Sequence, residues 1–451
     1  MAIDKTITGA EAVITALVEN GVEVIFGYPG GAVLPLYDAI FDNKKIKHIL
    51  VRHEQAAVHA AEGYARSTGK VGCVLVTSGP GATNAITGLT DALMDSIPVI
   101  CLSGQVPTHL IGTDAFQEAD TTGISRPCTK HNYLVKNADN LCDIIHESFD
   151  IASTGRPGPV LIDLPKDIQL TKIKYNKKIN RIKNKSSNNN PKIDMKIITK
   201  VVDLLVNAHK PIIYAGGGVI NAGPKTSTLL TELVDLLNSP VTLTLMGLGS
   251  VSNDNKNFLG MLGMHGTYEA NLAMHNCDVM LNVGARFDDR VTGRLNAFAP
   301  NSKKIHIDID KSSINKVVSV DFGIVGDCKE VLTILVQEIK KLHNQKNLKS
   351  KTDWWTQIKE WKKKDSLGFK QIGKNIKPQQ AIKSLYNKTK SFDTYITTEV
   401  GQHQMWAAQY FGFSKPNHWM TSGGLGTMGY GLPSSMGVQI AHPDSLVIDI
   451  S

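Results

Sequence analysis

The stretch VGCVLVTSGPGATNAITGLTDALMDSIPVICLSG, residues 71–104, decides the fold class. It opens with an apolar run (71–77), turns at the glycines of SGPG, continues as a small-residue helix (82–95) and closes with a second apolar run (98–104). Two β-branched, apolar strands joined through a helix are typical of a parallel sheet that helices cover on both faces. We therefore predict an α/β protein built from doubly wound parallel sheets.

The same alternation extends in both directions from this stretch. Near the start, Thr8 and Glu11 predict a capping box for a helix that Gly21 ends. Further apolar runs predict strands at 22–27, 46–52, 158–165, 211–218, 240–247, 277–286, 303–310, 394–401 and 444–451. Two polar stretches divide the series, which predicts domains at 1–170, 194–341 and 376–451, with linkers at 171–193 and 342–375.

Composition places the chain among globular proteins of more than one domain. The 451 residues are too many for a single core, and 42% hydrophobic with 20% charged residues is ordinary. Residues 171–190 carry seven lysines and arginines without an acid, so their removal reduces the net charge from +8 to +1. This Asn-rich stretch indicates a solvated linker, and we expect no nucleic-acid partner.

Membrane and disulfide-bonded classes are also excluded. Every apolar run is shorter than the ~18 residues of a membrane span, and we expect neither a secretory nor a transit signal before the first helix. The six cysteines, at positions 73, 101, 128, 142, 277 and 328, include no C-x-x-C pair. We therefore expect reduced thiols in a cytoplasmic protein without a membrane partner.

The segment HEQAAVHAAEGYAR (53–66) places Glu54 at the start of a small-residue helix, directly after the predicted strand 46–52. One interpretation is a carboxylate that interacts with the helix dipole. The other is a carboxyl in apolar surroundings, its pKa raised by desolvation, that exchanges a proton with a heterocyclic cofactor. The alanines that follow would let a flat group approach closely. The residues alone leave both interpretations open.

Glycine-rich turns follow several predicted strands, at the edge where ligands bind in open α/β sheets. FGYPGG (26–31) and TSGPGATN (77–84) are such turns, although tight turns without a ligand have the same composition. AGGG (215–218) and HIDID (306–310) are typical of a dinucleotide site but lack the regular G-x-G-x-x-G. The glycines of GGLGTMGYGLP (423–433) each cost about 1 kcal/mol relative to alanine inside a helix, which a closely approaching ligand would explain.

Two polar motifs complete the set of candidate sites. GARFDDR (284–290) supplies two arginines suited to a carboxylate or a phosphate, although a surface ion-pair cluster has the same composition. EVGQHQMW (399–406) contains His403, which is either a ligand-binding residue or a histidine of the core.

Taken together, these motifs resemble the large, catalytic subunits of the acetolactate synthase (acetohydroxyacid synthase) family, bacterial type, which are thiamine-diphosphate enzymes. The matching stretches occur in family order from about residue 7 to the last residue. GTDAFQE (112–118), GMHGTYEAN (263–271) and GARFDDR (284–290) are the most specific of them. The resemblance implies a pyrimidine-binding domain, a central FAD-binding domain and a diphosphate-binding domain, with active sites between two chains.

The resemblance also implies the reaction and the partners. The family removes carbon dioxide from pyruvate on thiamine diphosphate and transfers the two-carbon unit to pyruvate or 2-oxobutyrate. The products are 2-acetolactate and 2-aceto-2-hydroxybutyrate, in the first common step of branched-chain amino-acid biosynthesis. The implied cofactors are thiamine diphosphate, Mg²⁺ and FAD, the last without net redox chemistry in this reaction. The implied assembly is a homodimer of large subunits with a regulatory small subunit.

Site residues follow from the resemblance by matching position. Glu54 would bond the aminopyrimidine ring of the cofactor and promote its imino tautomer. The residues that act on substrate would be Glu54, Gln117, Lys166 and Arg290, with Phe116 in the substrate channel. Thiamine diphosphate would contact Glu54, Val400, Gly401, Gln402, His403, Gly426 and Met428. FAD would contact Arg156, His265, Gly266, Thr267, Gly284, Ala285, Arg286, Asp308, Ile309, Asp310 and Asp327.

The end of the sequence departs from the family pattern. Family members continue from the last predicted strand into a G-D-G motif and later asparagines that hold Mg²⁺, a cation that prefers oxygen ligands. Here the sequence stops at Ser451. We therefore expect a C-terminally truncated chain with an incomplete third domain, no metal ligands up to residue 451 and no activity as it stands.

Three other interpretations compete with this one. The chain could be a different thiamine-diphosphate 2-oxo acid decarboxylase or carboligase, which product analysis would separate. It could be a nicotinamide dehydrogenase built on the middle domain, although the regular fingerprint is absent. It could also be an inactive remnant that folds without catalysing a reaction.

Overall fold

The computed structural model describes residues 5–175, 192–343 and 349–451. The chain forms two compact units. The first contains the residues up to 189 together with 395–400 and 420–451, and the second contains 190–394 and 401–419. The α/β fold class with parallel sheets is confirmed in both units.

The main sheet of the first unit has six parallel strands in the order β3-β2-β4-β5-β7-β6. Their bounds are β2 Val24–Gly27, β3 Lys47–Leu50, β4 Gly72–Val76, β5 Val99–Gln105, β6 His131–Leu134 and β7 Val160–Pro165. The strand order reverses between β2 and β4, so the loops that follow these two strands diverge to opposite faces and leave a crevice for a ligand.

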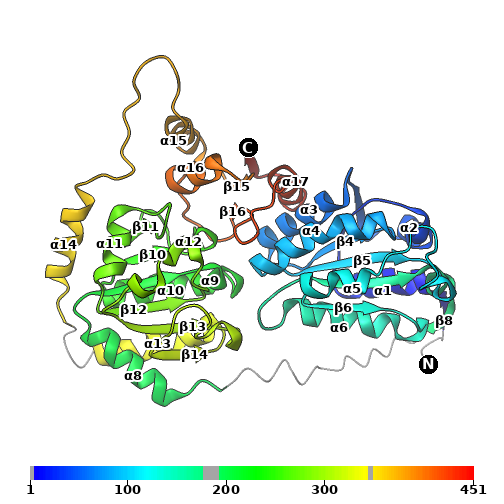
Figure 1. Cartoon of the computed structure of the whole chain (residues 1–451), viewed down its shortest axis with the longest axis horizontal. Coiled ribbons are helices and arrows are strands. Elements are labelled where there is room, and N and C mark those ends of the chain that lie inside the picture. Colours follow the sequence, from blue (N-terminus) through cyan, green and yellow to red (C-terminus); the bar gives the residue numbers. More distant parts are fainter. Residues whose placement is uncertain (1–4, 176–191, 344–348) are drawn as a thin grey trace. The chain divides into compact units, whose positions relative to one another are not determined.

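Helices cover both faces of this sheet (Figure 1). Alternate strand residues point to opposite faces: Ile25 packs in one core with α1, α2 and α6, and Phe26 packs in the other with α3 and α4. The helix bounds are α1 Gly9–Glu19, α2 Leu34–Asp42, α3 Glu54–Thr68, α4 Pro80–Asp95, α5 Thr121–Ser125, α6 Leu141–Ser153 and α7 Lys166–Leu170. The predicted capping box is confirmed, because Glu11 N donates to Thr8 Oγ1 at 3.2 Å and Thr8 N donates to Glu11 Oε2 at 2.7 Å.

The first unit also contains two smaller sheets. β1 (Lys5–Thr8) pairs antiparallel with β8 (Lys172–Tyr175), which begins one residue after the start of the predicted first linker. The remainder of that linker, residues 176–191, lies outside the described residues. The carboxyl-terminal sheet has the order β16-β15-β17, with bounds Trp419–Met420, Thr394–Thr398 and Leu446–Ile450.

Helix α17 (Gly431–Ala441) joins this carboxyl-terminal sheet to the main part of the first unit. It packs directly on α3, and two glycines set the closeness of that contact. A Cβ on Gly63 would collide with the carbonyl oxygen of Ser434, and a Cβ on Gly437 would collide with that of Ala60. The two helices therefore approach with backbone against backbone.

The sheet of the second unit has six parallel strands in the order β11-β10-β9-β12-β13-β14. Counted within this sheet, the order is 3-2-1-4-5-6, the order of dinucleotide-binding folds. The bounds are β9 Pro211–Ala215, β10 Val241–Leu243, β11 Phe258–Met261, β12 Val279–Val283, β13 Lys303–Asp308 and β14 Phe322–Val325. The switch point lies between β9 and β12, where AGGG and GAR follow their strands.

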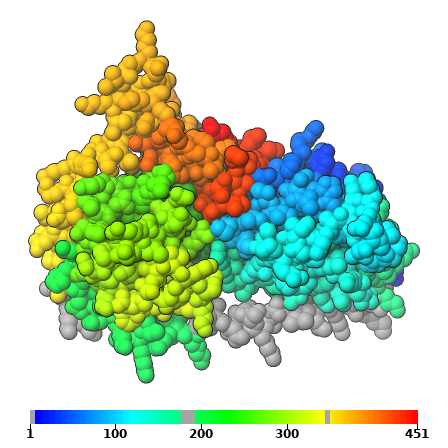
Figure 2. Space-filling model, in the orientation of Figure 1, coloured from blue at the N-terminus to red at the C-terminus, as the bar shows by residue number. Residues whose placement is uncertain are grey.

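Helices of the second unit pack on both faces of its sheet (Figure 1). α13 contacts both α8 and α10, and α11 and α14 share a core with Ile212 and Tyr214 of β9. The bounds are α8 Met195–Asn207, α9 Gly217–Asn221, α10 Pro224–Leu237, α11 Tyr268–Asn276, α12 Asp289–Thr292, α13 Cys328–His343, α14 Thr352–Lys362, α15 Pro378–Thr389 and α16 Gln402–Tyr410. The stretch 401–419 lies against the rest of this unit (Figure 2), where Asn253 N donates to Phe413 O at 3.1 Å.

Part of the predicted second linker is helical. α14 buries Trp354, whose indole Nε1 donates to Pro211 O at 3.0 Å. Residues 344–348 lie outside the described part. All six cysteines are free, in agreement with the expected reduced thiols. Over the described residues, the helices are too short or too polar to cross a membrane.

Candidate functional site

Glu54 is the first residue of α3, directly beyond β3 at the carboxyl edge of the first sheet. His53 caps this helix, because its Nδ1 accepts a hydrogen bond from Gln55 N at 3.1 Å. The Glu54 side chain is buried, with 7% of its surface exposed. Asn84 of α4 donates from Nδ2 to Glu54 Oε2 at 3.0 Å, which fixes the orientation of the carboxylate. Sequence reasoning missed Asn84, although it lies within the quoted TSGPGATN motif.

The second oxygen of this carboxylate, Oε1, receives no hydrogen bond from the part of the chain that the structure describes. It lies beside Gly81, where an added Cβ would be 3.4 Å from Oε1 and 2.7 Å from Thr77 Cγ2. The Thr77 hydroxyl at the same place is buried without a hydrogen-bond partner among the described residues. A carboxylate oxygen and a buried hydroxyl, both with unused capacity, fit a polar ring that would bond to them.

Loops at the switch point bring Gln117 to the same crevice. Gly30 packs against Thr77, since a Cβ there would lie 2.5 Å from the Thr77 side chain. Gly79 has φ +55°, and a Cβ there would lie 2.7 Å from Gln117 O. Gln117 itself has φ +59°, and the adjacent Phe116 side chain is 88% exposed.

The glycine-rich segment 422–431 lies at the amino end of α3. Gln55, the residue after Glu54, donates from Nε2 to Met428 O at 3.1 Å. Glu399 holds the far side of the turn, because its carboxylate accepts from Gly429 N at 2.9 Å and Gly431 N at 2.7 Å. The Met428 side chain is 81% exposed. The structure thus brings Glu54 and Met428 together within the first unit.

The remaining candidate residues of the first unit lie at strand and helix ends. Gly426 has φ +73°, and its nearest neighbour at the Cβ position is Val400 Cγ1 at 3.8 Å. Lys166 is half-buried at the start of α7, directly after β7. Arg156 bonds to the last turn of α4, with Nε donating to Ser96 Oγ at 2.7 Å and Nη2 donating to Leu93 O and Met94 O at 3.3 and 3.2 Å.

The second unit holds the other residues expected for thiamine diphosphate. Gly401 has φ +154° and precedes α16, which Gln402 and His403 begin. A Cβ on Gly401 would lie 2.9 Å from His403 Cε1. His403 Nε2 is buried without a hydrogen-bond partner in the described part of the chain, which fits a role in holding a ligand.

The two loops at the switch point of the second sheet touch each other. Gly218 N donates to Gly284 O at 3.0 Å, and a Cβ on Gly216 would lie 2.5 Å from the same oxygen. Glycine is therefore required there by contact between the two loops. Arg286 follows this contact and pairs with Asp288 at 3.1 Å, with 38% of its side chain exposed.

Acidic residues expected for FAD end the neighbouring strands. Asp308 closes β13 and accepts from Asp310 N at 2.8 Å. Asp310 accepts from Ser312 N at 2.9 Å, and Asp327 accepts from Lys329 N at 2.8 Å at the start of α13. Ile309 lies between the first two acids in sequence. The carboxyl edge of this sheet thus carries glycines, cations and acids suited to pyrophosphate and ribose groups.

Arg290, expected to bind substrate, lies in the second unit at the start of α12. Its side chain is 68% exposed, and its Nε is 3.7 Å from Asp289 Oδ2. Its backbone is better fixed, since Arg290 N donates to Asp288 Oδ1 at 3.0 Å and Arg290 O accepts from Met264 N at 2.8 Å.

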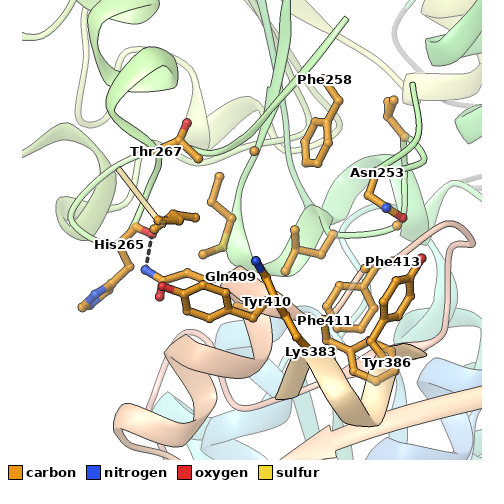
Figure 3. A pocket seen from close by; sticks show the side chains of 18 of the residues that line it. Asn253, Phe258, His265, Thr267, Lys383, Tyr386, Gln409, Tyr410, Phe411 and Phe413 are labelled. Carbon is orange, nitrogen blue, oxygen red and sulfur yellow. Dashed lines mark hydrogen bonds between the residues drawn. The ribbon is translucent and has the colours of Figure 1, made fainter. Parts of the chain in front are cut away.

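A hollow of about 360 Å³ lies within the second unit, beside His265 and Thr267 (Figure 3). Gln409 Nε2 donates to His265 O at 2.9 Å across its rim. Thr267 caps α11, while Ala285 and Gly266 are held in the adjoining turns. Aromatic side chains form much of the wall, a lining that suits a planar group: Phe258, Tyr386, Tyr410, Phe411 and Phe413.

Three domain families of thiamine pyrophosphate enzymes match the chain. The N-terminal TPP binding domain matches residues 7–124, the central domain matches 198–335 and the C-terminal TPP binding domain matches 399–451. The three matches follow the order that the resemblance implied, and the central match covers all six strands of the second sheet.

Individual relatives extend this similarity over nearly the whole chain. The acetolactate synthase large subunit of Haemophilus influenzae is 51% identical over 451 residues, which are 99% of this chain and 78% of the relative. The acetolactate synthase isozyme 3 large subunit of Escherichia coli is 49% identical over 449 residues, which are 99% of this chain and 78% of the relative. The mitochondrial acetolactate synthase catalytic subunit of Saccharomyces cerevisiae is 46% identical over 465 residues, and the match covers 98% of this chain and 66% of the relative. The chain therefore belongs to the acetolactate synthase large-subunit family of thiamine-diphosphate-dependent transferases.

Proposed function

We propose that this chain makes 2-acetolactate from two molecules of pyruvate, and 2-aceto-2-hydroxybutyrate from pyruvate and 2-oxobutyrate. One carbon dioxide leaves for each product formed. The observation that carries the proposal is the buried Glu54 carboxylate, whose Oε1 lacks a donor within the described residues and lies beside the unpartnered Thr77 hydroxyl. Membership of the family supports the substrate class.

Glu54 would hold and release a proton at Oε1, because Asn84 already occupies Oε2. When bound, thiamine diphosphate supplies the electron sink for loss of carbon dioxide from a 2-oxo acid. The residues that would hold this cofactor are Glu54, Val400, Gly401, Gln402, His403, Gly426 and Met428. The Nε2 of His403, unpartnered within the described residues, supports this assignment.

Substrate contacts are proposed on both units. Phe116, Gln117 and Lys166 would line the channel to Glu54, which the exposure of Phe116 and the position of Gln117 beside Gly79 support. Arg290 would pair with the carboxylate of the second 2-oxo acid, because its exposed guanidinium has only a long ion pair to Asp289 in the described part.

FAD and Mg²⁺ complete the proposed cofactors. The residues that would contact FAD come from four places. They are Arg156; His265, Gly266 and Thr267 in one turn; Gly284, Ala285 and Arg286 in another; and Asp308, Ile309, Asp310 and Asp327 at the ends of neighbouring strands. The 3-2-1-4-5-6 strand order supports this choice for the second unit. Mg²⁺ would accompany the cofactor diphosphate, and we assign no residue between 1 and 451 to it.

The assembly and the domain limits are also proposals. A homodimer of large subunits, with a regulatory small subunit in the cytoplasm, follows the family resemblance and the naming of the relatives as large subunits. We keep domains at 1–170, 194–341 and 376–451, which the order of the three family matches supports.

Product analysis tests the reaction. The purified holoenzyme is supplied with thiamine diphosphate, Mg²⁺, FAD and pyruvate, with and without 2-oxobutyrate. We expect acetolactate, and the aceto-hydroxybutyrate when the second acid is present. Acetaldehyde as the sole product would indicate a different thiamine-diphosphate decarboxylase and would overturn the proposal.

A further inference from the structure

A chain of polar side chains, half-buried at Gln55 and buried at the other three residues, links α3 and α4 to the glycine-rich segment 422–431. It consists of Gln55, His59, Glu62 and Asp91, all within the first unit. His59, Glu62 and Asp91 are fully buried, and one nitrogen or oxygen of each lies within 4.8 Å of the others. We call these four residues, with their bonds to Ser422, Thr427 and Met428, the clasp. The reaction proposed above uses none of the three buried residues.

The donors at one end of the clasp fix the direction of its hydrogen bonds. Gln55 Nε2 lies 3.1 Å from Met428 O, so this atom is the amide nitrogen and donates. The same nitrogen lies 3.1 Å from His59 Nε2, which must therefore accept. The proton of neutral His59 is then on Nδ1, which lies 3.4 Å from Glu62 Oε1. His59 Nδ1 thus faces Glu62, although the separation is longer than a normal N–H···O hydrogen bond.

The acceptors at the other end belong to Asp91. Asp91 Oδ1 accepts from Ser422 Oγ and, at 2.9 Å, from Thr427 Oγ1. Ser422 Oγ in turn accepts from Thr427 N at 2.8 Å. Asp91 Oδ2 and both oxygens of Glu62 are buried without a donor among the described residues. Two buried carboxyl groups in contact need a proton between them, since two carboxylates side by side repel each other.

We propose that Glu62 carries this proton at neutral pH and donates it to Asp91 Oδ2, so that the clasp links Met428 to Thr427 through its four side chains. Glu62, His59 and Asp91 are then positioning residues for the glycine-rich segment. That the segment holds thiamine diphosphate, through Gly426 and Met428, rests on the proposed function. The contacts of the clasp stand independently of it.

The charged neighbours agree with a protonated Glu62. The groups facing the pair are Arg66 of α3, Asp95 of α4, and Tyr430 and Glu399 near the glycine-rich segment. Arg66 donates to Thr421 O at 2.6 Å and to the Tyr430 hydroxyl at 3.0 Å. Asp95 accepts from Gly423 N at 2.9 Å and Gly424 N at 2.7 Å. Arg66 therefore already faces the negative charge of Asp95. Among these neighbours, Asp95 raises the pKa of Glu62 and Arg66 lowers it, both less than burial raises it.

Burial favours the uncharged form of all three titrating groups, so it raises the pKa of the two carboxyl groups and lowers that of the imidazole. It raises the pKa of Glu62 well above its ordinary value. Burial and the neighbouring Glu62 raise the pKa of Asp91 to about 7, although Ser422 opposes this shift. Burial lowers the pKa of His59 to about 4, so the imidazole is neutral as the bonding scheme requires.

Infrared difference spectra of the full chain test the proton directly. A protonated carboxyl has a carbonyl band distinct from that of a carboxylate, and the band of Glu62 is expected at neutral pH. Glu62→Gln should abolish it. Glu23→Gln is the matched control, because Glu23 is 64% exposed and paired with Lys70. The control should leave the band unchanged, and a parent chain without a band assignable to Glu62 would overturn the proposal.

Amide exchange tests whether the clasp holds the segment. The side-chain amide of the Glu62→Gln variant would donate to Asp91 and accept from His59, so the amides of Thr427 and Gly424 should exchange as in the parent chain. Glu62→Met has similar length but no hydrogen-bonding atom, and exchange there should be on the order of tenfold faster. Equal exchange in both variants would show that the clasp does not position the segment.

Asp91→Asn separates a shared proton from a bound metal. The side-chain amide of this variant would accept from Ser422 and Thr427 and donate to an ionised Glu62, so the segment should stay protected while the infrared band disappears. His59, Glu62 and Asp91 could instead ligate a divalent cation, and then each amide variant would lose metal and protection together. Stoichiometric metal in the parent chain would overturn the proposal. Loss of acetolactate formation with an intact clasp would count only against the proposed function.

Discussion

The two six-stranded sheets place different chemistry at the same kind of edge. Each is open and parallel, with loops that diverge at a switch point. The first presents Glu54, which is 7% exposed and held by Asn84. The second presents Arg290, which is 68% exposed and 3.7 Å from its nearest acid.

The difference in burial between Glu54 and Arg290 matches the difference between their proposed roles. A proton-transferring carboxyl benefits from a dry site, where contacts with a bound ring are not weakened by water. A guanidinium that captures a charged substrate must first be reachable from water, and it loses part of that water only when the substrate arrives. Substitutions at the first edge should therefore affect chemistry, and those at the second should affect capture.

Glu54→Gln should give the largest effect. The amide keeps the bond to Asn84 but cannot exchange a proton, so acetolactate formation should fall ~10²–10⁴-fold. Unfolding free energy should change by only ~0.3–1 kcal/mol, the usual contribution of a charge at a helix start. Turnover is measured beside Glu23→Gln as control. Near-normal turnover in the folded variant would remove Glu54 from the reaction.

Arg290→Ala should act on capture of the second 2-oxo acid. Loss of a charge-assisted contact of ~1.5–3 kcal/mol corresponds to ~10–150-fold in the second step. Acetaldehyde should rise relative to acetolactate, as measured by product ratio at fixed pyruvate. Arg294→Ala, an exposed arginine on the same loop, is the matched control. An unchanged ratio of acetaldehyde to acetolactate would show that Arg290 does not capture the second 2-oxo acid.

Gly437→Ala should weaken the first unit without touching the second. A Cβ there meets the carbonyl oxygen of Ala60, so α17 must move away from α3 at a cost of ~1–3 kcal/mol. Gly31→Ala is the control, because nothing among the described residues lies within 4 Å of its Cβ position. Urea unfolding of both variants measures the difference. Equal stability would mean that the contact between the two helices is looser than the structure indicates.

Central strands could be predicted from sequence because their residues are continuously apolar and buried on both faces. β6, β11 and β14 were missed, since HNYL, FLGM and FGIV are short and mix apolar with polar or glycine positions. All three are edge strands and only partly buried, so the apolar signal is weaker. β8 was missed for a different reason, because its lysines belong to the charged stretch taken as a linker.

The residues of the candidate site also divide into those that the sequence signals and those that only the fold brings together. Glu54 could be singled out in the sequence because a carboxylate stands where an apolar helix is expected, and its role stays a prediction. Its partner Asn84 is 30 residues away, and the Ser422–Asp91 bond spans 331 residues. Hydrogen bonds over such separations leave no local pattern in the sequence, since each residue alone is compatible with a solvated position. Only the packing of α3, α4 and α17 brings these residues together.

Asp163→Asn should give the smallest effect, in the pH dependence of the first unit. Asp163 is buried in β7, where Gln105 Nε2 donates to Oδ2 at 2.9 Å and Oδ1 has no donor in the described part of the chain. Burial raises the pKa of Asp163 to about 7. Between ~pH 4 and pH 7 the folded chain therefore binds more protons at this residue than the unfolded chain, and stability falls as the pH rises.

The second sheet provides the contrast, because one of its buried polar strand residues is the neutral Asn282, bonded through both side-chain atoms to Ala285. The side-chain amide of the Asp163→Asn variant would accept from Gln105 and cannot ionise, so the variant should lose less stability between about pH 5 and about pH 8 than the parent chain does. Each kcal/mol recovered corresponds to roughly 2–4 °C in melting temperature for a unit of this size. Calorimetry at the two pH values measures the effect. Parallel pH curves for parent and variant would show that Asp163 is ionised in the fold, and that the first sheet tolerates a buried charge as the second sheet tolerates a buried amide.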